Sequence, residues 1–163
     1  MGPTRTNFVG RRTLNLEQTQ LFTGLSADVL ARIEELAHVE TFAAGQTLFF
    51  EGDPAEELYI LREGRIELTY TLPQDSTTEI RITQVGPGEN FAWSALALGG
   101  TLSSHARALS TSNAFVIPVQ RLHSVFYEFP YAGYKVMTRL SQQILTRLRE
   151  TRKELRWLHQ GAR

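Results

Sequence analysis

Hydrophobic and polar residues follow three different patterns along the chain, and the first predicts a helix over residues 25–37. Ser26 is expected to cap its N-terminus, and Leu25 lies where a hydrophobic staple would hold the preceding chain. The residues at helical spacing form one apolar stripe: Val29, Leu30, Ile33, Leu36 and Ala37. The predicted helix therefore has one face to bury against the rest of the protein.

The second pattern, from about residue 40 to 118, consists of short strand-like segments separated by glycines. Segments 58–62 and 65–71 flank Glu63 and Gly64, where glycine suits the positive φ of a type I′ turn, so we expect a hairpin. Within 65–71 the hydrophobic residues alternate with polar ones and predict one buried face: Ile66, Leu68 and Tyr70.

Further strands are expected after a polar turn at 73–78 and at 106–110 and 114–117. Many short strands with regular turns predict a β sandwich or barrel rather than a parallel sheet.

The third pattern is helical and occupies the C-terminal part of the chain. Residues 119–128 predict a short helix with one apolar face, and Pro130 is expected at the first position of the next helix. From residue 137 onward the apolar positions alternate at spacings of four and three, the period of a two-stranded coiled coil. We expect a homodimer interface along this seam, formed by Met137, Ile144, Leu148, Leu155 and Leu158 and weakened by Ser141 and Thr151. Packing of the same face on the protein's own barrel is the alternative.

The patterns divide the chain into three parts. We expect a flexible arm over residues 1–15, a domain with a helix, strands and a hinge helix over 16–128, and a long helix over 129–163. The fold class is therefore mainly β with flanking α-helices.

The composition is that of one ordinary globular domain. The chain has 163 residues, of which 42% are hydrophobic and 21% charged, and it contains no cysteine. The lack of cysteine excludes disulfides, cysteine-ligated clusters and thiol catalysis. No apolar run approaches the roughly 20 residues of a membrane span and no signal peptide is recognised, so we expect a cytoplasmic protein without membrane contact.

The net charge is zero, but the charges are unevenly distributed. Residues 135–163 contain eight basic and two acidic residues, so the rest of the chain carries an equal negative excess. One interpretation is a solvated face of a long helix. The other is an acidic protein partner, or docking against the protein's own acidic body.

Several local motifs occur in the order found in cyclic nucleotide-binding domains, which this chain resembles over about residues 20–158. The motifs lie at 42–48, 51–53, 58–67, 86–88 and 91–96. The resemblance implies a double-stranded β-helix, a jelly-roll-like β-roll, with an N-terminal helix, a hinge helix and a long C-terminal helix. It also implies cyclic AMP or cyclic GMP as the small-molecule effector.

The resemblance places the pocket at two segments, with these candidate ligand-binding residues: Phe91, Ala92, Trp93, Ser94, Ala95, Leu96, Ser103, Ser104, His105 and Ala106. In the family a Glu binds the ribose and an Arg binds the phosphate, but Trp93 and Ser104 stand at those positions here. Arg107 lies three residues after Ser104, so we expect it to point to the opposite face of its strand. Ala92 replaces the usual glycine.

These departures predict weak or no binding of cyclic nucleotides. Losing a charge-assisted contact to a buried phosphate costs about 2–5 kcal/mol, which corresponds to a 30-fold to several-thousand-fold loss of affinity. Trp93 either fills the ribose space or forms a platform for a stacked ligand. His105, the histidine among the candidate ligand-binding residues, is either an exposed strand residue or a hydrogen-bond partner of a ligand anion.

No enzyme motif, metal-ligand spacing or P-loop is recognised, so we expect neither catalysis nor a bound metal. The leading hypothesis is a stand-alone regulatory sensor or adaptor. The alternatives are a signalling domain that binds cyclic AMP or cyclic GMP, a ligand-free protein-interaction module, and a truncated transcription regulator. Because the sequence ends at Arg163 without a helix-turn-helix module, we expect no DNA binding.

Overall fold

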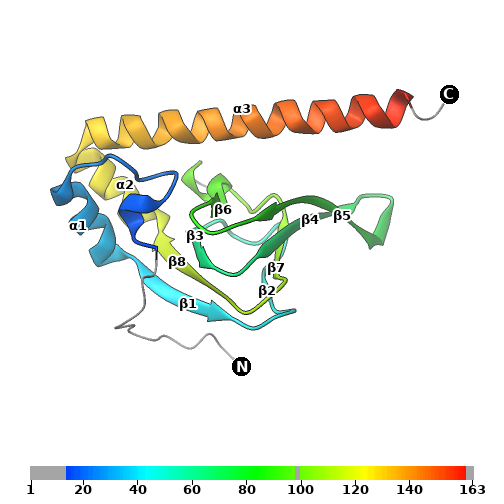
Figure 1. The fold of residues 1–163 in the computed structure, drawn as a ribbon, viewed down its shortest axis with the longest axis horizontal. Coiled ribbons are helices and arrows are strands. Elements are labelled where there is room, and N and C mark those ends of the chain that lie inside the picture. Colours follow the sequence, from blue (N-terminus) through cyan, green and yellow to red (C-terminus); the bar gives the residue numbers. More distant parts are fainter. Residues whose placement is uncertain (1–13, 98–99, 161–163) are drawn as a thin grey trace.

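Two four-stranded antiparallel sheets form the body of the protein; α1, α2 and the start of α3 lie at one end of it, and α3 extends from there along the sheets (Figure 1). The computed structural model describes residues 14–97 and 100–160. The strand order is β1-β8-β3-β6 in the first sheet and β2-β7-β4-β5 in the second. This architecture is the β-roll with N-terminal and C-terminal helices that the sequence predicts.

The strands are β1 (His38–Phe42), β2 (Thr47–Phe49), β3 (Glu57–Glu63), β4 (Ile66–Leu72), β5 (Asp75–Val85), β6 (Asn90–Phe91), β7 (His105–Ala108) and β8 (Ser112–Pro118). The helices are the 3₁₀ helices η1 (Leu16–Gln18) and η2 (Trp93–Leu96) and the α-helices α1 (Ala27–Leu36), α2 (Val119–Glu128) and α3 (Pro130–Gln160). The predicted arm over 1–15 lies almost entirely outside the described residues.

The predicted helix boundaries agree closely with the structure. Ser26 is the N-cap residue of α1 with an extended backbone, although its side chain makes no capping hydrogen bond. The centre of the apolar stripe of α1 is buried. The hinge helix α2 has the predicted bounds, and Pro130 is the first residue of α3. Proline suits that position because the first helical residue needs no intrahelical N–H donor.

The predicted hairpin around Glu63 and Gly64 is wrong. β3 pairs with β8 and β6, whereas β4 pairs with β5 and β7, so the chain passes from one sheet to the other at this point. The positive φ expected for Gly64 is present, at 94°. Gly64 packs so closely on Ser112 of β8 that an added Cβ would lie 2.7 Å from the Cα of Ser112. Glycine is therefore needed to bend the chain between the sheets, not to close a hairpin.

The alternation predicted for β4 holds only as far as Leu68. Thr69 is buried and Tyr70 is partly exposed, because the register against β5 shifts between Leu68 and Thr69. The polar turn is also shorter than predicted, since Leu72 already pairs with Asp75.

Asp75 organises the start of β5. Its carboxylate accepts hydrogen bonds from the backbone N–H and hydroxyl of Thr77 and from the hydroxyl of Thr78. These bonds stabilise the ionised form and lower the pKa of Asp75 to about 2.

Two hydrophobic clusters make up the core. One joins η1, α1, α2 and the first part of α3 to the first sheet, and the other fills the space between the two sheets. Val136 and Leu140 anchor α3 in the first cluster. Arg139 strengthens this attachment, because its Nη1 donates to the carbonyl oxygen of Leu21 at 3.1 Å. Beyond this anchor α3 runs along both sheets toward the β4–β5 end of the roll (Figure 1).

Among the described residues, no helix has the length and apolar character to cross a membrane.

Candidate functional site

The segment that follows β6 makes a sharp turn into η2. Ala92 has φ 57° and is the one described residue other than glycine with a positive φ. This left-handed conformation costs an alanine about 1 kcal/mol, which explains why glycine is favourable here. η2 contains only four residues, and the N–H of Ala95 donates to the carbonyl oxygen of Ala92 at 3.0 Å. The N–H of Ala95 is therefore occupied within the turn and does not face a ligand.

A cavity of about 300 Å³ lies between this turn, the second sheet and α3. The roll contributes the following lining residues: Leu68, Ile82, Ala92, Trp93, Ser94, Leu102, Ser103 and Ser104. The helix contributes Ile144, Arg147, Leu148 and Thr151. The volume is at the lower end of the range typical of small-molecule pockets.

The structure separates the ten predicted ligand-binding residues into three groups. Five line the cavity: Ala92, Trp93, Ser94, Ser103 and Ser104. Four are buried in the core and do not line it: Phe91, Ala95, Leu96 and Ala106. The tenth, His105, lies on β7 outside the cavity lining. The cavity thus brings the two divergent positions, Trp93 and Ser104, to one wall.

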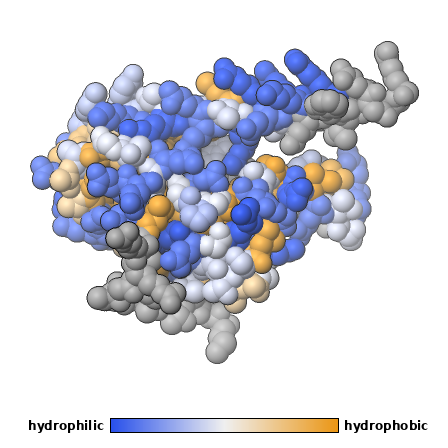
Figure 2. All heavy atoms as spheres, in the orientation of Figure 1, coloured by the Kyte–Doolittle hydropathy of each residue, from blue (hydrophilic) through white to orange (hydrophobic). Residues whose placement is uncertain are grey.

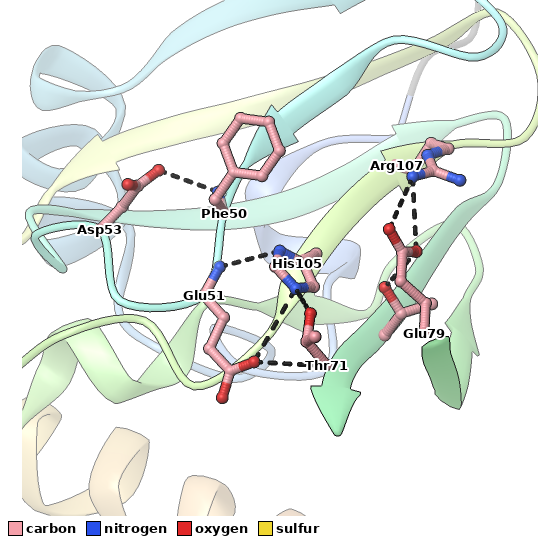
Figure 3. A network of polar contacts seen from close by, with 8 residues as sticks. Phe50, Glu51, Asp53, Thr71, Glu79, His105 and Arg107 are labelled. Atoms are coloured by element: carbon pink, nitrogen blue, oxygen red, sulfur yellow. Dashed lines mark hydrogen bonds and ion pairs between the residues drawn. The ribbon is translucent and has the colours of Figure 1, made fainter. Parts of the chain in front are cut away.

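His105 is held by a polar network instead of being an exposed strand histidine (Figure 3). Its side chain is 16% exposed. The N–H of Glu51 donates to Nδ1 at 3.1 Å, so the ring proton resides on Nε2, which donates to the hydroxyl of Thr71 at 2.7 Å. The N–H of Thr71 in turn donates to the Glu51 carboxylate at 3.2 Å. Because both ring nitrogens are bonded, this histidine connects the loop after β2 to β4 and β7.

Arg107 points away from the interior of the roll, as the strand alternation predicts. Its Nη2 forms an ion pair with the Glu79 carboxylate at 3.1 Å (Figure 3). Ala106 and Ala108, on either side of it, are fully buried. Arg107 is also absent from the cavity lining, so it does not replace the arginine that position 104 lacks.

Sequence reasoning missed Arg147, the one charged residue among the described residues that line the cavity with Trp93 and Ser104. Arg147 lies on α3 and lines the cavity opposite Trp93 and Ser104. Burial lowers the pKa of Arg147, while the negative charges of Glu89 and Glu150 act in the opposite direction. The sequence gives no signal for this role, because Arg147 is one of eight basic residues in the C-terminal segment and is distant from the pocket motifs.

A second cavity of about 440 Å³ adjoins the first and shares Trp93, Ile144 and Arg147 with it. Its remaining lining residues are all polar or charged: Gln20, Glu89, Asn90, Arg139, Gln142, Gln143, Thr146 and Glu150. Figure 2 shows hydrophilic residues along much of α3 and a hollow between this helix and the body of the protein. Trp93 and Arg147 therefore stand between a largely apolar cavity and a polar one.

Part of the predicted dimer seam faces the protein's own roll, and part of it is exposed. Ile144, Leu148 and Thr151 line the 300 Å³ cavity. Met137, Ile144 and Leu148 are nevertheless 40%, 36% and 43% exposed. The side chains of Leu155 and Leu158 lie outside the described residues. Of the residues that the structure describes, no group of His, Asp and Glu side chains is arranged to hold a metal ion.

Comparisons with known proteins identify related sequences and folds. The model of a family described as "Cyclic nucleotide-binding domain" matches residues 39–128. The chain is 31% identical over 136 residues to Glutaminase 1 of Bradyrhizobium diazoefficiens, covering 83% of this chain and 21% of that protein. It is 29% identical over 109 residues to the Global nitrogen regulator of Synechococcus elongatus, covering 66% of this chain and 48% of that protein.

A solved structure has the same fold. The N-terminal domain of a transcriptional regulator from Streptomyces coelicolor A3(2) matches with a TM-score of 0.67 and 25% identity, over 80% of this chain and 92% of that one. The chain spans only 21% and 48% of the length of the two curated relatives. The activities of those whole proteins therefore cannot be assigned to this chain from the sequence match.

Proposed function

Because the chain belongs to the cyclic nucleotide-binding domain family, we propose that it is a regulatory domain that senses a small molecule other than a cyclic nucleotide. The observation that carries this proposal is the 300 Å³ cavity, whose lining includes Trp93 and Ser104, the residues that the resemblance assigns to the ribose and phosphate positions. The role is one of binding, not catalysis. Relatives that are named as regulators support it.

The side chains of the cavity support weak or absent binding of cyclic nucleotides. Trp93 offers one N–H donor and a large apolar plane, so it cannot accept a hydrogen bond from a ribose hydroxyl. Ser104 is neutral and short, and it cannot form the charge-assisted pair of hydrogen bonds that an arginine makes to a phosphate. Arg107, the nearest arginine in sequence, is paired with Glu79 on the outside of the roll.

The position of the cavity supports a signalling role for α3. One wall belongs to the turn around Trp93 and the other to α3, while α3 is anchored near its start by Val136 and Leu140. A ligand that contacts both walls has different affinities for different positions of the helix, and this difference is what shifts a conformational equilibrium. The hinge helix α2, which packs against α3, would transmit the shift to the core.

Titration with a metabolite panel tests the sensor proposal. We expect at least one compound that is not a nucleotide to raise the melting temperature in a saturable way, because a ligand that binds only the folded state stabilises it. Cyclic AMP and cyclic GMP, at about 1 mM, should produce no comparable shift. Differential scanning fluorimetry followed by calorimetry measures both. Micromolar binding of either nucleotide, or no shift with any compound, would contradict the proposal.

We also propose a homodimer through the seam of α3. The exposed residues Met137, Ile144 and Leu148 have the spacing of a coiled-coil interface and are too apolar for a fully solvated face. A ligand that moves α3 would then change the relative position of the two protomers in the dimer.

The dimer is tested by replacing Met137 and Leu148 with Glu in one variant. Because like charges would face each other across the seam, we expect this variant to be monomeric in sedimentation equilibrium, whereas the unmodified protein is dimeric. Arg149→Glu is the control, since Arg149 is exposed and lies off the seam. The proposal of a dimer interface along the seam would be refuted if the unmodified protein were monomeric. It would also be refuted if the Arg149→Glu control dissociated as much as the seam variant.

A further inference from the structure

We propose that the 300 Å³ cavity binds a small organic anion with a flat apolar body, and that Arg147 of α3 is the charge partner of this anion. The inference rests on the proposed function and adds the chemical class of the ligand and the residue that recognises its charge. Four observations carry it: the charge of the cavity wall, the environment of Arg147, the apolar surface of the wall, and the free hydroxyl groups beside it.

The wall of the cavity has a single sign of charge. Of the described residues that line it, Arg147 alone carries a charge, and no carboxylate is among them. The carboxylates of Glu89 and Glu150 line the neighbouring polar cavity and are not part of this wall. A ligand in the 300 Å³ cavity therefore meets one positive charge and no negative one. This arrangement attracts anions and disfavours cations.

The guanidinium of Arg147 is partly buried without a direct partner. Within the part of the chain that the structure describes, it forms neither an ion pair nor a side-chain hydrogen bond. Burial lowers the pKa of Arg147, which means that its surroundings solvate the cation less well than water does. An anion placed beside a poorly solvated guanidinium gains a charge-assisted bidentate contact and removes this imbalance.

The remaining surface of the cavity suits an apolar ring system. Trp93 contributes an aromatic plane, and Leu68, Ile82, Leu102 and Ile144 contribute aliphatic side chains from three different elements and the segment before β7. Aromatic rings stack on or pack edge-to-face against an indole. At about 300 Å³, the cavity fits a compact body of one or two fused rings better than a larger ligand.

Hydroxyl groups complete the recognition surface. Ser94, Ser103 and Ser104 line the cavity, and none of the three hydroxyls forms a hydrogen bond to another described residue. These groups can donate to a carboxylate that is already paired with Arg147. The anion would thus connect α3 to the segment before β7. One guanidinium with neutral donors matches a monocarboxylate, since a second negative charge would have no cation to pair with.

The test compares two probes of the same shape that differ only in charge, 2-naphthoate and 2-naphthamide. Binding is measured by calorimetry and by quenching of Trp93 in a Trp157→Phe background, where Trp93 is the one remaining tryptophan because the chain contains two. We expect naphthoate to bind at least about tenfold more tightly than the amide, and this preference should weaken as the salt concentration rises.

Matched variants assign the preference to one side chain. Arg147→Gln should remove the difference between the two probes, and Arg147→Lys should retain part of it because it keeps the charge but not the planar fork. Arg149→Gln removes the same charge from an exposed position two residues away and should leave both affinities unchanged. Circular dichroism and the unchanged amide affinity show that the Arg147 variants are folded.

The outcomes distinguish this inference from the proposed function. If both probes bind equally well and quench Trp93, the cavity is a ligand site but the assignment of an anion is wrong. The same conclusion follows if naphthoate keeps its advantage in Arg147→Gln. If neither probe binds, and no member of the metabolite panel does, both the anion and the sensor proposal fail.

Discussion

Replacing Trp93 with Glu and Ser104 with Arg in one variant is expected to raise the affinity for cyclic AMP by about 100-fold or more. Both positions line the 300 Å³ cavity, so the two new side chains would enter the same space as the ligand. Glu at position 93 supplies an acceptor for the ribose hydroxyl, and Arg at position 104 supplies a charged fork for the phosphate. A charge-assisted contact to a buried anion contributes about 2–5 kcal/mol, which sets the expected size of the gain.

The control places a polar but uncharged side chain at position 104. Trp93→Glu combined with Ser104→Gln should recover only a small part of the affinity, because glutamine cannot neutralise the phosphate. Arg107→Ala should have no effect on nucleotide affinity, since Arg107 pairs with Glu79 outside the cavity. Calorimetric titration with cyclic AMP measures all three. Equal affinity of the unmodified protein and the double variant would show that side-chain divergence does not limit binding.

The second large effect concerns stability. Gly64→Ala is expected to lower the free energy of unfolding by about 2–4 kcal/mol. Gly64 has φ 94°, and an added Cβ would lie 2.7 Å from the Cα of Ser112 and closer still to its Oγ. Ser112 cannot move freely, because its Oγ accepts a hydrogen bond from the N–H of Arg65 at 3.1 Å and donates to the carbonyl oxygen of Ser110 at 2.8 Å. The substitution therefore combines backbone strain with overpacking between β3 and β8.

Gly45→Ala is the matched comparison. Gly45 also has a positive φ, of 83°, but nothing lies within 4 Å of an added Cβ. This variant should lose only about 1 kcal/mol, the cost of the left-handed backbone for alanine. Urea denaturation monitored by circular dichroism gives both values. If the two variants lose equal stability, the contact with Ser112 contributes nothing beyond backbone strain.

The helices were predictable because their signals are local. Ser26 and Pro130 are local signals that mark the first turn of a helix, and both mark boundaries that the structure contains, although the Ser26 side chain makes no capping hydrogen bond. Alternation also located the segments that form β3, β4, β5, β7 and β8, whereas the short strands β1, β2 and β6 were not predicted individually. Strand pairing was not predictable, as Gly64 illustrates. A type I′ turn and a crossing between sheets both require positive φ, and the choice depends on Ser112, which is distant in sequence.

The candidate site divides in the same way. The segments around Trp93 and Ser104 were found from their resemblance to a family motif, and five of the ten predicted residues line the cavity. The other residues of those segments face the core or, like His105, the outer network. Arg147 could not be found, because it enters the cavity from α3 and no local pattern distinguishes it from its basic neighbours.

By itself, the sequence determined the β-roll class and the helix boundaries, since both depend on residue types at short spacings. The loss of the ribose-binding and phosphate-binding side chains at positions 93 and 104 is a prediction from the resemblance. Tertiary structure alone decided that the roll still contains a cavity and that α3 brings Arg147 to its wall. The physical reason is that a cavity and its charge are formed by elements distant in the chain. Their packing, and not any one segment, determines which groups lose contact with water.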